Sequence, residues 1–227
     1  RAAGLSQERI DALMSKPMGL PPTGLYGLID LIGLDVMNFV GKNLALNLPK
    51  GDAGQGFTKF PAAEQAMFER GQLGRKSGGG FYRVSKLDDG SKKKETFDLA
   101  TGTWRDAEDV SLDVGPDVMF DDTADGTFAW DIMGGTLAYA ADLVPEISDD
   151  IVNIDRAMRW GFGWSKGPFE MIDSIGPARF AEKCRAKLER TPKMLEVLES
   201  AGADTFYSEN GTSFLGLDST FHKVPAE

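Results

Sequence analysis

The chain reads GLYGLIDLIG at residues 24–33 and GPFEMIDSIG at residues 167–176. The two stretches are offset by 143 residues and keep Gly, an aromatic residue, Ile-Asp, Ile and Gly in the same order. A short amphipathic pattern precedes each of them, IDALM at residues 10–14 and IDRAM at residues 154–158, with an offset of 144. Unless two apolar stretches match by chance, this spacing indicates a helical unit that occurs twice in the chain.

Capping and helix-breaking residues set the limits of the expected helices. In the first half we expect a helix over residues 7–16, a short helix that ends at residue 31, a third that starts at residue 35, and a fourth from residue 61 to residue 71. In the second half we expect helices over residues 127–144, 149–160, 170–175, 177–190 and 192–202. Val36, Phe39, Val40 and Leu44 form the apolar stripe predicted for the helix that starts at residue 35. Phe128, Ile132 and Val144 are predicted to face inward, and Ser148 to be the N-cap of the helix over 149–160.

Each half ends in a hairpin pattern. The first pattern starts at Phe81-Tyr82 and turns at Asp89-Gly90, and the second starts at Phe206-Tyr207 and turns at Asn210-Gly211. Asp-Gly and Asn-Gly favour the positive φ angles of tight hairpin turns. Between the halves, residues 105–126 are acidic and irregular. The sequence therefore predicts a mainly α protein with two tandem domains, 1–104 and 127–227, joined by a linker over 105–126.

Composition excludes several classes of partner. The chain of 227 residues holds 25 Lys and Arg against 35 Asp and Glu, a net charge of −10, which argues against a nucleic-acid or anionic membrane surface. No run approaches the roughly 18 apolar residues of a membrane span. The single cysteine, Cys184, excludes an internal disulfide and fits a reducing compartment. It is interpreted as a half-buried helix position, with a reactive thiol as the alternative. The start at Arg1 suggests a piece of a longer or processed protein.

Motifs for nucleotides and metals are incomplete. In the Gly54-Gln55-Gly56 stretch, Lys59 stands where a dinucleotide fingerprint needs its third glycine. The run GRKSGGG at residues 74–80 has the reverse order of a P-loop and precedes an aromatic strand, so it is interpreted as a turn that lets two backbones approach closely. One histidine, His222, and one cysteine cannot build a usual zinc site. The calcium-like stretch from Asp121 lacks its final glutamate. No catalytic constellation is visible.

The ordered motifs resemble a known family. PMG at residues 17–19, GLYGLIDLIGLDV at 24–36 and GRKSGGGFY at 74–82 look like the helical C-terminal domain of 3-hydroxyacyl-CoA dehydrogenases. IDRAMRWGFGW at residues 154–164 with GPFE at 167–170 looks like the second such domain of the long, fused β-oxidation enzymes. The resemblance implies two tandem helical domains of the 6-phosphogluconate dehydrogenase C-terminal-like type. The second half departs from the pattern, because it lacks the Gly-Arg-Lys-Ser loop before Phe206.

The resemblance also implies an activity of the parent protein. The family oxidises 3-hydroxyacyl-CoA to 3-ketoacyl-CoA by hydride transfer to NAD, in fatty-acid β-oxidation and in the cytoplasm. NAD and the catalytic His–Glu pair lie in an N-terminal Rossmann domain, so this chain is expected to hold no cofactor and no catalytic residue and to be inactive by itself. Its helical domains are expected to form one wall of the acyl-CoA cleft and a domain or homodimer interface. An enoyl-CoA hydratase fused to the parent is compatible with this.

Five residues are candidates for substrate contact under this hypothesis. Met18 and Leu20, on a turn beside Tyr26, would give an apolar lip to an acyl chain, and core packing is the alternative. Arg75 and Lys76 would face the anionic CoA, and solvated charge is the alternative. Asp30 and Asp173 have identical places in both copies and are expected to hydrogen-bond local backbone. Two rival functions are a non-enzymatic helical dimerisation or interaction module and a free-standing enzyme of another class.

Overall fold

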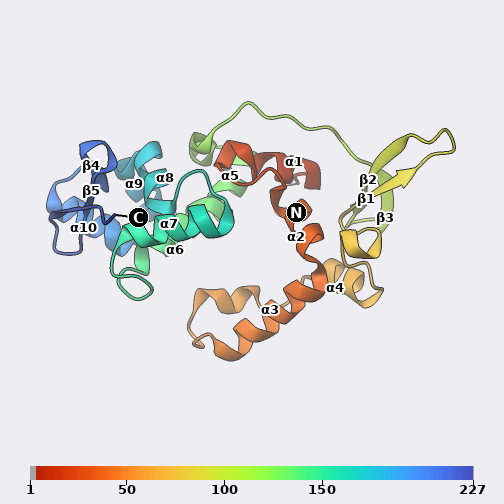
Figure 1. Ribbon diagram of the computed structural model, residues 1–227, viewed down its shortest axis with the longest axis horizontal. Helices are drawn as coiled ribbons and strands as arrows, with labels where there is room; N and C mark the ends of the chain where they lie inside the picture. Colours follow the sequence, from red (N-terminus) through yellow and green to blue (C-terminus); the bar gives the residue numbers. More distant parts are fainter. Residues whose placement is uncertain (1–3, 227) are drawn as a thin grey trace. The chain divides into compact units, whose positions relative to one another are not determined.

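The structure is a computed structural model that describes residues 4–226, and the chain forms two compact units. The N-terminal unit contains Ser6–Ala12 and Thr23–Ser111, and the C-terminal unit contains Leu13–Pro22 and the chain from Leu112 onward. The described residues are mainly helical and carry two small antiparallel sheets of three strands each (Figure 1). This confirms the mainly α class that the helical periodicity predicts.

The N-terminal unit combines four α-helices with one sheet. Its elements are α1 (Gln7–Leu13), α2 (Gly24–Ile32), α3 (Leu34–Asn47), η2 (Ala53–Phe57), α4 (Ala62–Glu69), η3 (Arg75–Ser77), β1 (Tyr82–Lys86), β2 (Lys92–Asp98) and β3 (Thr103–Asp106). The break between α2 and α3 is at Gly33, whose φ of 101° a side chain would disfavour. The strands follow one another in the order β1-β2-β3, and the predicted Asp89-Gly90 turn joins the first two.

The core of the N-terminal unit lies between α2, α3, α4 and the sheet. Its fully buried apolar side chains are Leu34, Met67, Phe81 and Phe97. Tyr26, Trp104 and several other half-buried side chains pack around them. The predicted stripe of α3 is wrong, because Val36, Phe39 and Val40 are exposed on the surface of this helix. Helix α3 therefore starts at Leu34, one residue before the predicted start, and this residue is buried. The predicted apolar stripe is instead exposed to solvent.

The C-terminal unit is larger and more completely packed. Its elements are η1 (Lys16–Met18), η4 (Pro116–Phe120), α5 (Ala124–Ala129), the π-helical turn η5 (Trp130–Gly134), α6 (Gly135–Asp142), α7 (Ile151–Phe162), α8 (Pro168–Ile175), α9 (Pro177–Leu188), α10 (Lys193–Ala201), β4 (Tyr207–Ser208), η6 (Glu209–Gly211), β5 (Ser213–Leu215) and β6 (Phe221–Lys223). Helix α6 packs against α8 and α10, and α8 packs against α7 and α9. Strand β6 is an addition that the sequence does not signal.

Three local predictions in this unit need correction. Asp150 is the N-cap of α7, because its Oδ1 accepts the Asn153 amide at 2.8 Å, while the Ser148 hydroxyl donates to the Asp150 carbonyl. Ile132 is 38% exposed instead of facing inward; Ala129, Trp130 and Met133 form the buried side of this segment, because the π-helical turn shifts its register. The stretch 105–126 is not wholly irregular, since η4 buries Val118 and Met119.

Candidate functional site

In both copies of the repeat, an Asp carboxylate accepts hydrogen bonds from the start of the helix that carries the Gly-aromatic motif; it is half-buried in the first copy and buried in the second. In the N-terminal unit the carboxylate belongs to Asp11 on α1, and in the C-terminal unit it belongs to Asp155 on α7. Each carboxylate accepts two successive backbone amides, with one oxygen for each amide. The donors are Tyr26 and Gly27 for Asp11, at 2.7 and 3.0 Å, and Phe169 and Glu170 for Asp155, at 2.8 and 3.1 Å. Unpaired amides at the positive end of a helix are thereby satisfied.

A glycine makes this contact sterically feasible in each copy. A Cβ on Gly24 would overlap the Asp11 side chain, and a Cβ on Gly167 would overlap Asp155. The same donors, acceptors and glycine recur at the offset of 143–144 residues. Chance similarity between apolar stretches does not account for a repeated set of hydrogen bonds, so the repeat is structural.

A second carboxylate joins α2 or α8 to the start of the following sheet. Asp30 accepts the amides of Phe81 and Tyr82 at 2.8 and 2.7 Å. Asp173 accepts the amides of Phe206 and Tyr207 at 2.7 and 2.9 Å. Both carboxylates therefore bind backbone, but the expectation that this backbone is local is wrong, because it lies 51 residues away in the first copy and 33 in the second. We call these carboxylates the strand clamps.

Aromatic pairs accompany the strand clamps. The rings of Tyr26 and Phe81 lie 4.7 Å apart, and those of Phe169 and Phe206 lie 5.0 Å apart. These distances are within the range of favourable tilted or edge-to-face pairs. Tyr26 thus packs against the core of the N-terminal unit, which favours the core-packing alternative over an exposed lip at this residue.

Burial dominates the electrostatics of these carboxylates. Desolvation raises the pKa of Asp155 to about 7 and that of Asp173 to about 6, although backbone amides donate to both. The pKa values of Asp11 and Asp30 are raised for the same reason. The Tyr207 hydroxyl also donates to Asp155 at 2.8 Å. Because every one of these oxygens already accepts backbone or side-chain donors, the carboxylates support the fold and are poorly placed to act as acids or bases on a ligand.

The GRKSGGG run at residues 74–80 forms a turn that its own backbone hydrogen bonds close and that packs against Asp30. Gly74 and Gly79 exchange backbone hydrogen bonds at 3.1 and 3.2 Å, and the Ser77 and Gly78 amides bond carbonyls within the same turn. A Cβ on Gly80 would overlap the Asp30 carboxylate, and a Cβ on Gly74 would overlap the Asp30 backbone. The prediction of close backbone approach is confirmed. Those amides are occupied, so they offer no cradle to a phosphate.

The five predicted substrate-contact residues fall into both units. Met18 and Leu20 belong to the C-terminal unit, and Tyr26, Arg75 and Lys76 belong to the N-terminal unit. Met18 is fully buried, so in this structure it serves packing, whereas Leu20 is half-buried. An acyl contact at Leu20 stays a prediction.

The two cations of the turn differ in their surroundings. Lys76 forms an ion pair with Asp35 at 2.5 Å, and its ammonium also reaches the Ile32 carbonyl at 3.4 Å. These contacts place Lys76 at the junction of α2 and α3. Arg75 is exposed on the same turn, and its charge acts on Asp30 only as a minor electrostatic influence. Arg75 is therefore the better candidate of the two for an external anion.

Sequence reasoning missed an ion pair between a buried glutamate and a partly exposed arginine that anchors α1 to the sheet. The Arg105 guanidinium donates to both oxygens of Glu8 at 2.7 and 2.8 Å, and the Thr96 hydroxyl donates to Glu8 at 2.6 Å. Burial would raise the pKa of Glu8, but these hydrogen bonds outweigh it and lower the pKa to about 2. The only sequence signal was a glutamate in an otherwise inward position, since the equivalent residue of the second copy is Val152.

The remaining reactive side chains do not form a site. Cys184 is fully buried on α9, and burial raises its pKa to about 12, which supports a packing role. His222 lies on β6, is exposed, and bonds Asp218 at 2.9 Å. Among residues 4–226, no group of three or more potential ligands could hold a metal ion. Within the same range no single helix is long and apolar enough to cross a membrane; α2 and α3 meet this test only as a pair bent by 92°.

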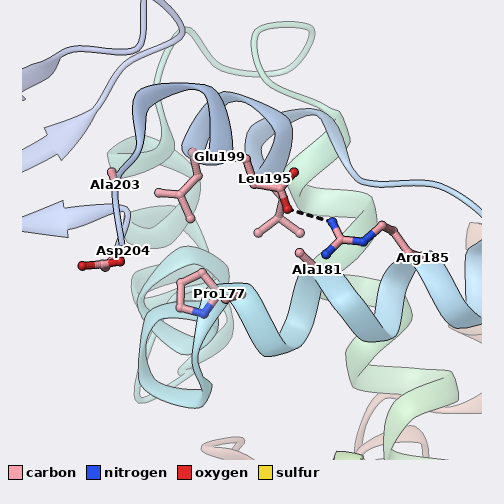
Figure 2. A pocket seen from close by; sticks show the side chains of 9 residues that line it. Pro177, Ala181, Arg185, Leu195, Glu199, Ala203 and Asp204 are labelled. Carbon is pink, nitrogen blue, oxygen red and sulfur yellow. Dashed lines mark hydrogen bonds and ion pairs between the residues drawn. The ribbon is translucent and has the colours of Figure 1, made fainter.

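A small surface pocket lies between α9 and α10 in the C-terminal unit (Figure 2). Pro177, Ala181 and Leu195 form apolar parts of its wall. An ion pair between Arg185 and Glu199, at 2.7 Å, crosses one side of it. Arg185 and Glu199 are thus paired with each other, Asp204 is a further charged residue of the wall, and none of the five predicted residues lines the pocket.

The fold is mainly helical, and in both copies of the repeat Asp carboxylates accept backbone amides and so hold the chain's own backbone in place. The family model described as "3-hydroxyacyl-CoA dehydrogenase, C-terminal domain" matches residues 2–84. Residues 2–84 accordingly belong to the family of 3-hydroxyacyl-CoA dehydrogenase C-terminal domains, as their motifs predict.

Relatives match well beyond those residues. A probable 3-hydroxyacyl-CoA dehydrogenase of Bacillus subtilis is 33% identical over 221 residues, which is 93% of this chain and 28% of the relative. A putative fatty acid oxidation complex trifunctional enzyme of Rickettsia felis is 34% identical over 72% of this chain and 23% of the relative. The fatty acid oxidation complex subunit alpha of Psychrobacter sp. is 29% identical over 87% of this chain and 27% of the relative. The chain thus spans about a quarter of the length of these relatives.

Proposed function

We propose that this chain is the C-terminal part of an NAD-dependent 3-hydroxyacyl-CoA dehydrogenase of fatty-acid oxidation in the cytoplasm. It comprises two tandem helical domains of the 6-phosphogluconate dehydrogenase C-terminal-like type, and it forms one wall of the acyl-CoA cleft and an interface with the rest of the enzyme. The proposal is supported by the equivalent strand clamps of the two copies, Asp30 and Asp173. It is also supported by the similarity of almost the whole chain to a protein named as a probable 3-hydroxyacyl-CoA dehydrogenase.

The chemistry of the described residues fits a supporting role. NAD would supply the hydride acceptor. Its binding outside this chain is supported by the glycine-rich turn, in which the amides of Gly74, Ser77, Gly78 and Gly79 bond carbonyls of the same turn. The buried carboxylates accept backbone amides, and Cys184 is inaccessible. These residues can therefore position a cleft wall, but they provide neither a general base for a 3-hydroxyl group nor a nicotinamide site.

Separate calorimetric titrations of acetoacetyl-CoA and NAD into this chain test the proposal. We expect weak binding of acetoacetyl-CoA, no binding of NAD and no turnover. Arg75→Ala should weaken the CoA signal, whereas Lys86→Ala, which removes another exposed cation of the same unit, should not. Turnover by this chain, or binding of NAD to it, would refute the proposal and favour a free-standing enzyme.

A second candidate function is a helical dimerisation module without a ligand of its own. It is favoured by the exposed apolar side chains of α3, where Phe39 is 68% and Leu46 is 85% exposed. Isolated exposed apolar residues are ordinary, but several on one helix indicate an interface. Light scattering after gel filtration decides between the two candidates, because a concentration-dependent dimer that binds neither CoA nor NAD would favour the module.

A further inference from the structure

The hairpin of the first copy is longer than that of the second. Strand β1 has five residues, Tyr82–Lys86, whereas β4 has two, Tyr207–Ser208. The turn that joins β1 to β2 projects from the rest of the N-terminal unit (Figure 1). Since the second copy forms its strand clamp at Asp173 without such an extension, the clamp does not require the extra length of β1.

Strand β1 lies at an edge of its sheet. In the order β1-β2-β3 only β2 is beside it. Hydrogen-bonded pairs occur at every second residue of an antiparallel ladder. Here they include Phe81 with Phe97, at 2.8 Å, and Leu87 with Ser91, at 2.9 Å. The residues of β1 between those that bond β2 therefore direct their backbone N–H and C=O groups away from the sheet.

These outward backbone groups belong to Tyr82, Val84 and Lys86. Those of Tyr82 are occupied, because its amide donates to Asp30 and its carbonyl accepts the Gly80 amide. Within residues 4–226, the outward groups of Val84 and Lys86 make no hydrogen bond. Val84 is 62% exposed and Lys86 is exposed as well. We call the outward backbone groups of Val84 and Lys86 the free edge.

One face of the hairpin beside the free edge is cationic. Val84 lies opposite Lys94, and Lys86 lies opposite Lys92. Side chains of opposite residues share a face of the sheet. We call Val84, Lys86, Lys92 and Lys94 the cationic face, and all four are exposed. Among the described residues, no carboxylate forms an ion pair with these three lysines.

The other face of the hairpin has paired charges. Arg83 pairs with Glu95 at 2.7 Å, and Lys93 pairs with Asp106 on β3. Like charges directly opposite each other destabilise a strand pair, so Lys86 and Lys92 do not serve the stability of the hairpin. In a protein with a net charge of −10, the cationic face is a local exception that favours an acidic partner.

The charges also discriminate between kinds of partner. Lysines on an edge strand discourage pairing with a second copy, because that copy would bring its own lysines against them. Asp88 and Asp89 are exposed in the turn at the hairpin tip. They would meet a bilayer or a nucleic acid first and repel its continuous negative charge. A single acidic strand laid along β1 avoids both conflicts.

We propose that the free edge and the cationic face together bind an extended acidic segment of a partner protein, which adds to the sheet as a further strand. Its backbone would pair with Val84 and Lys86, and its carboxylates would contact Lys86, Lys92 and Lys94. In strand addition, main-chain hydrogen bonds supply affinity and alternate side chains supply specificity. This inference does not depend on the proposed dehydrogenase function.

Amide exchange in the presence of a model peptide tests the proposal. The probe is the acetylated and amidated peptide Thr-Glu-Thr-Glu-Thr-Glu-Thr, and its control carries Lys in place of Glu. At a peptide concentration of about ten times its dissociation constant, the amides of Val84 and Lys86 in the 227-residue chain should exchange about tenfold more slowly. The amides of Arg83 and Ser85, which already face β2, should change little.

Two N-methylated peptides test whether the backbone of the peptide pairs with the free edge. One is methylated at every Glu and the other at every Thr. A strand beside β1 directs only one of these alternate sets of amides toward it. One methylated peptide should therefore bind like the parent peptide, and the other should not bind.

Charge variants test the contribution of the cationic face. The double variant Lys86→Gln and Lys92→Gln should bind the Glu peptide about fivefold more weakly, because two charge contacts are lost. Lys93→Gln is the matched control, since it removes the same charge from the neighbouring residue on the other face. Its affinity should be close to that of the wild type. Lys86→Gln alone repeats the test if the double variant does not fold.

Four results would overturn the inference. The first is a Glu peptide that does not slow the Val84 and Lys86 amides, or slows them no more than the Lys peptide does. The second is equal binding of both methylated peptides, which would show charge attraction without strand addition. The third is protection that increases with protein concentration in the absence of peptide, which would assign the free edge to a second copy. The fourth is protection by phosphatidylglycerol vesicles but not by the Glu peptide, which would assign the cationic face to a lipid surface.

Discussion

Replacing Arg105 with methionine is the perturbation that the structure predicts most sharply. The change leaves Glu8 buried without its charged partner, although the Thr96 hydroxyl and the Glu108 amide still donate to it. The Glu8 side chain is 4% exposed, so solvent cannot take over the role of the guanidinium. Removing one partner of a buried ion pair is costly because an uncompensated charge stays in a poorly solvated place.

The magnitude follows from the pKa of Glu8. Its pKa is lowered from 4.5 to about 2, and one unit corresponds to about 1.4 kcal/mol, so the native contacts of Glu8 contribute about 3 kcal/mol to the free energy of unfolding at pH 7. Since the folded-state pKa is depressed, this contribution is fully present above about pH 4.5 and is lost as the pH falls toward 2. We therefore expect Arg105→Met to cost about 3 kcal/mol at neutral pH.

Hydrogen exchange of the β2 and β3 amides measures this cost in the N-terminal unit without interference from the C-terminal unit. The cost should shrink at pH 3, because Glu8 without Arg105 takes up a proton. The matched control is the triple variant Glu8→Val, Thr96→Val and Arg105→Met, which copies the buried valine at position 152 and should recover most of the loss. A cost below about 1 kcal/mol at pH 7, or an equal cost at pH 3 and pH 7, would refute the reasoning.

Three further predictions follow from the clamps and the core. Because the pKa of Asp155 is raised to about 7, its contribution to stability is fully present below about pH 4 and is lost as the pH rises through 7. The urea midpoint of Asp155→Asn should therefore vary less between pH 4 and pH 7 than the midpoint of the wild type. An unchanged pH dependence of the midpoint would contradict the raised pKa. Gly80→Ala should destabilise the N-terminal unit by about 1–3 kcal/mol because its Cβ would overlap Asp30, whereas Gly56→Ala, which has open space around it, should change the midpoint of thermal unfolding little. Cys184 should react with a thiol reagent only at the rate of local or global opening, and labelling of the native protein at the rate of a free thiol would show that the site is accessible.

Local signals predicted much of the fold. Gly33 and the Asp-Gly turn at residue 89 act through backbone conformation, so their effects are visible in a single sequence. Asp30 and Asp173 also recur at a fixed offset, and this recurrence indicated a structural role for them before the contacts were known, whereas no role was predicted for Asp11 and Asp155. What the pattern could not indicate was the distance along the chain to the amides that Asp30 and Asp173 bind.

Predictions that depended on a partner surface were less successful. The apolar stripe of α3 was expected to be buried, but whether Phe39 and Val40 are covered depends on what packs against them and not on their periodicity. Glu8 was overlooked because its partner Arg105 is remote in sequence and lies on a strand. Ile132 faces outward because a π-helical turn changes the register of its helix, and no residue type announces that change.

The strand clamps also bear on how this architecture can diversify. The same two-amide contact closes a stretch of 51 residues in one copy and 33 in the other. Since the entropic cost of closing a loop grows only with the logarithm of its length, the intervening segment can gain or lose whole elements while its ends stay anchored. The region between α3 and α4 is thus a suitable place to insert a foreign peptide or reporter. The two copies of the repeat already differ in the length of the segment that the contact closes, and both keep the two-amide contact.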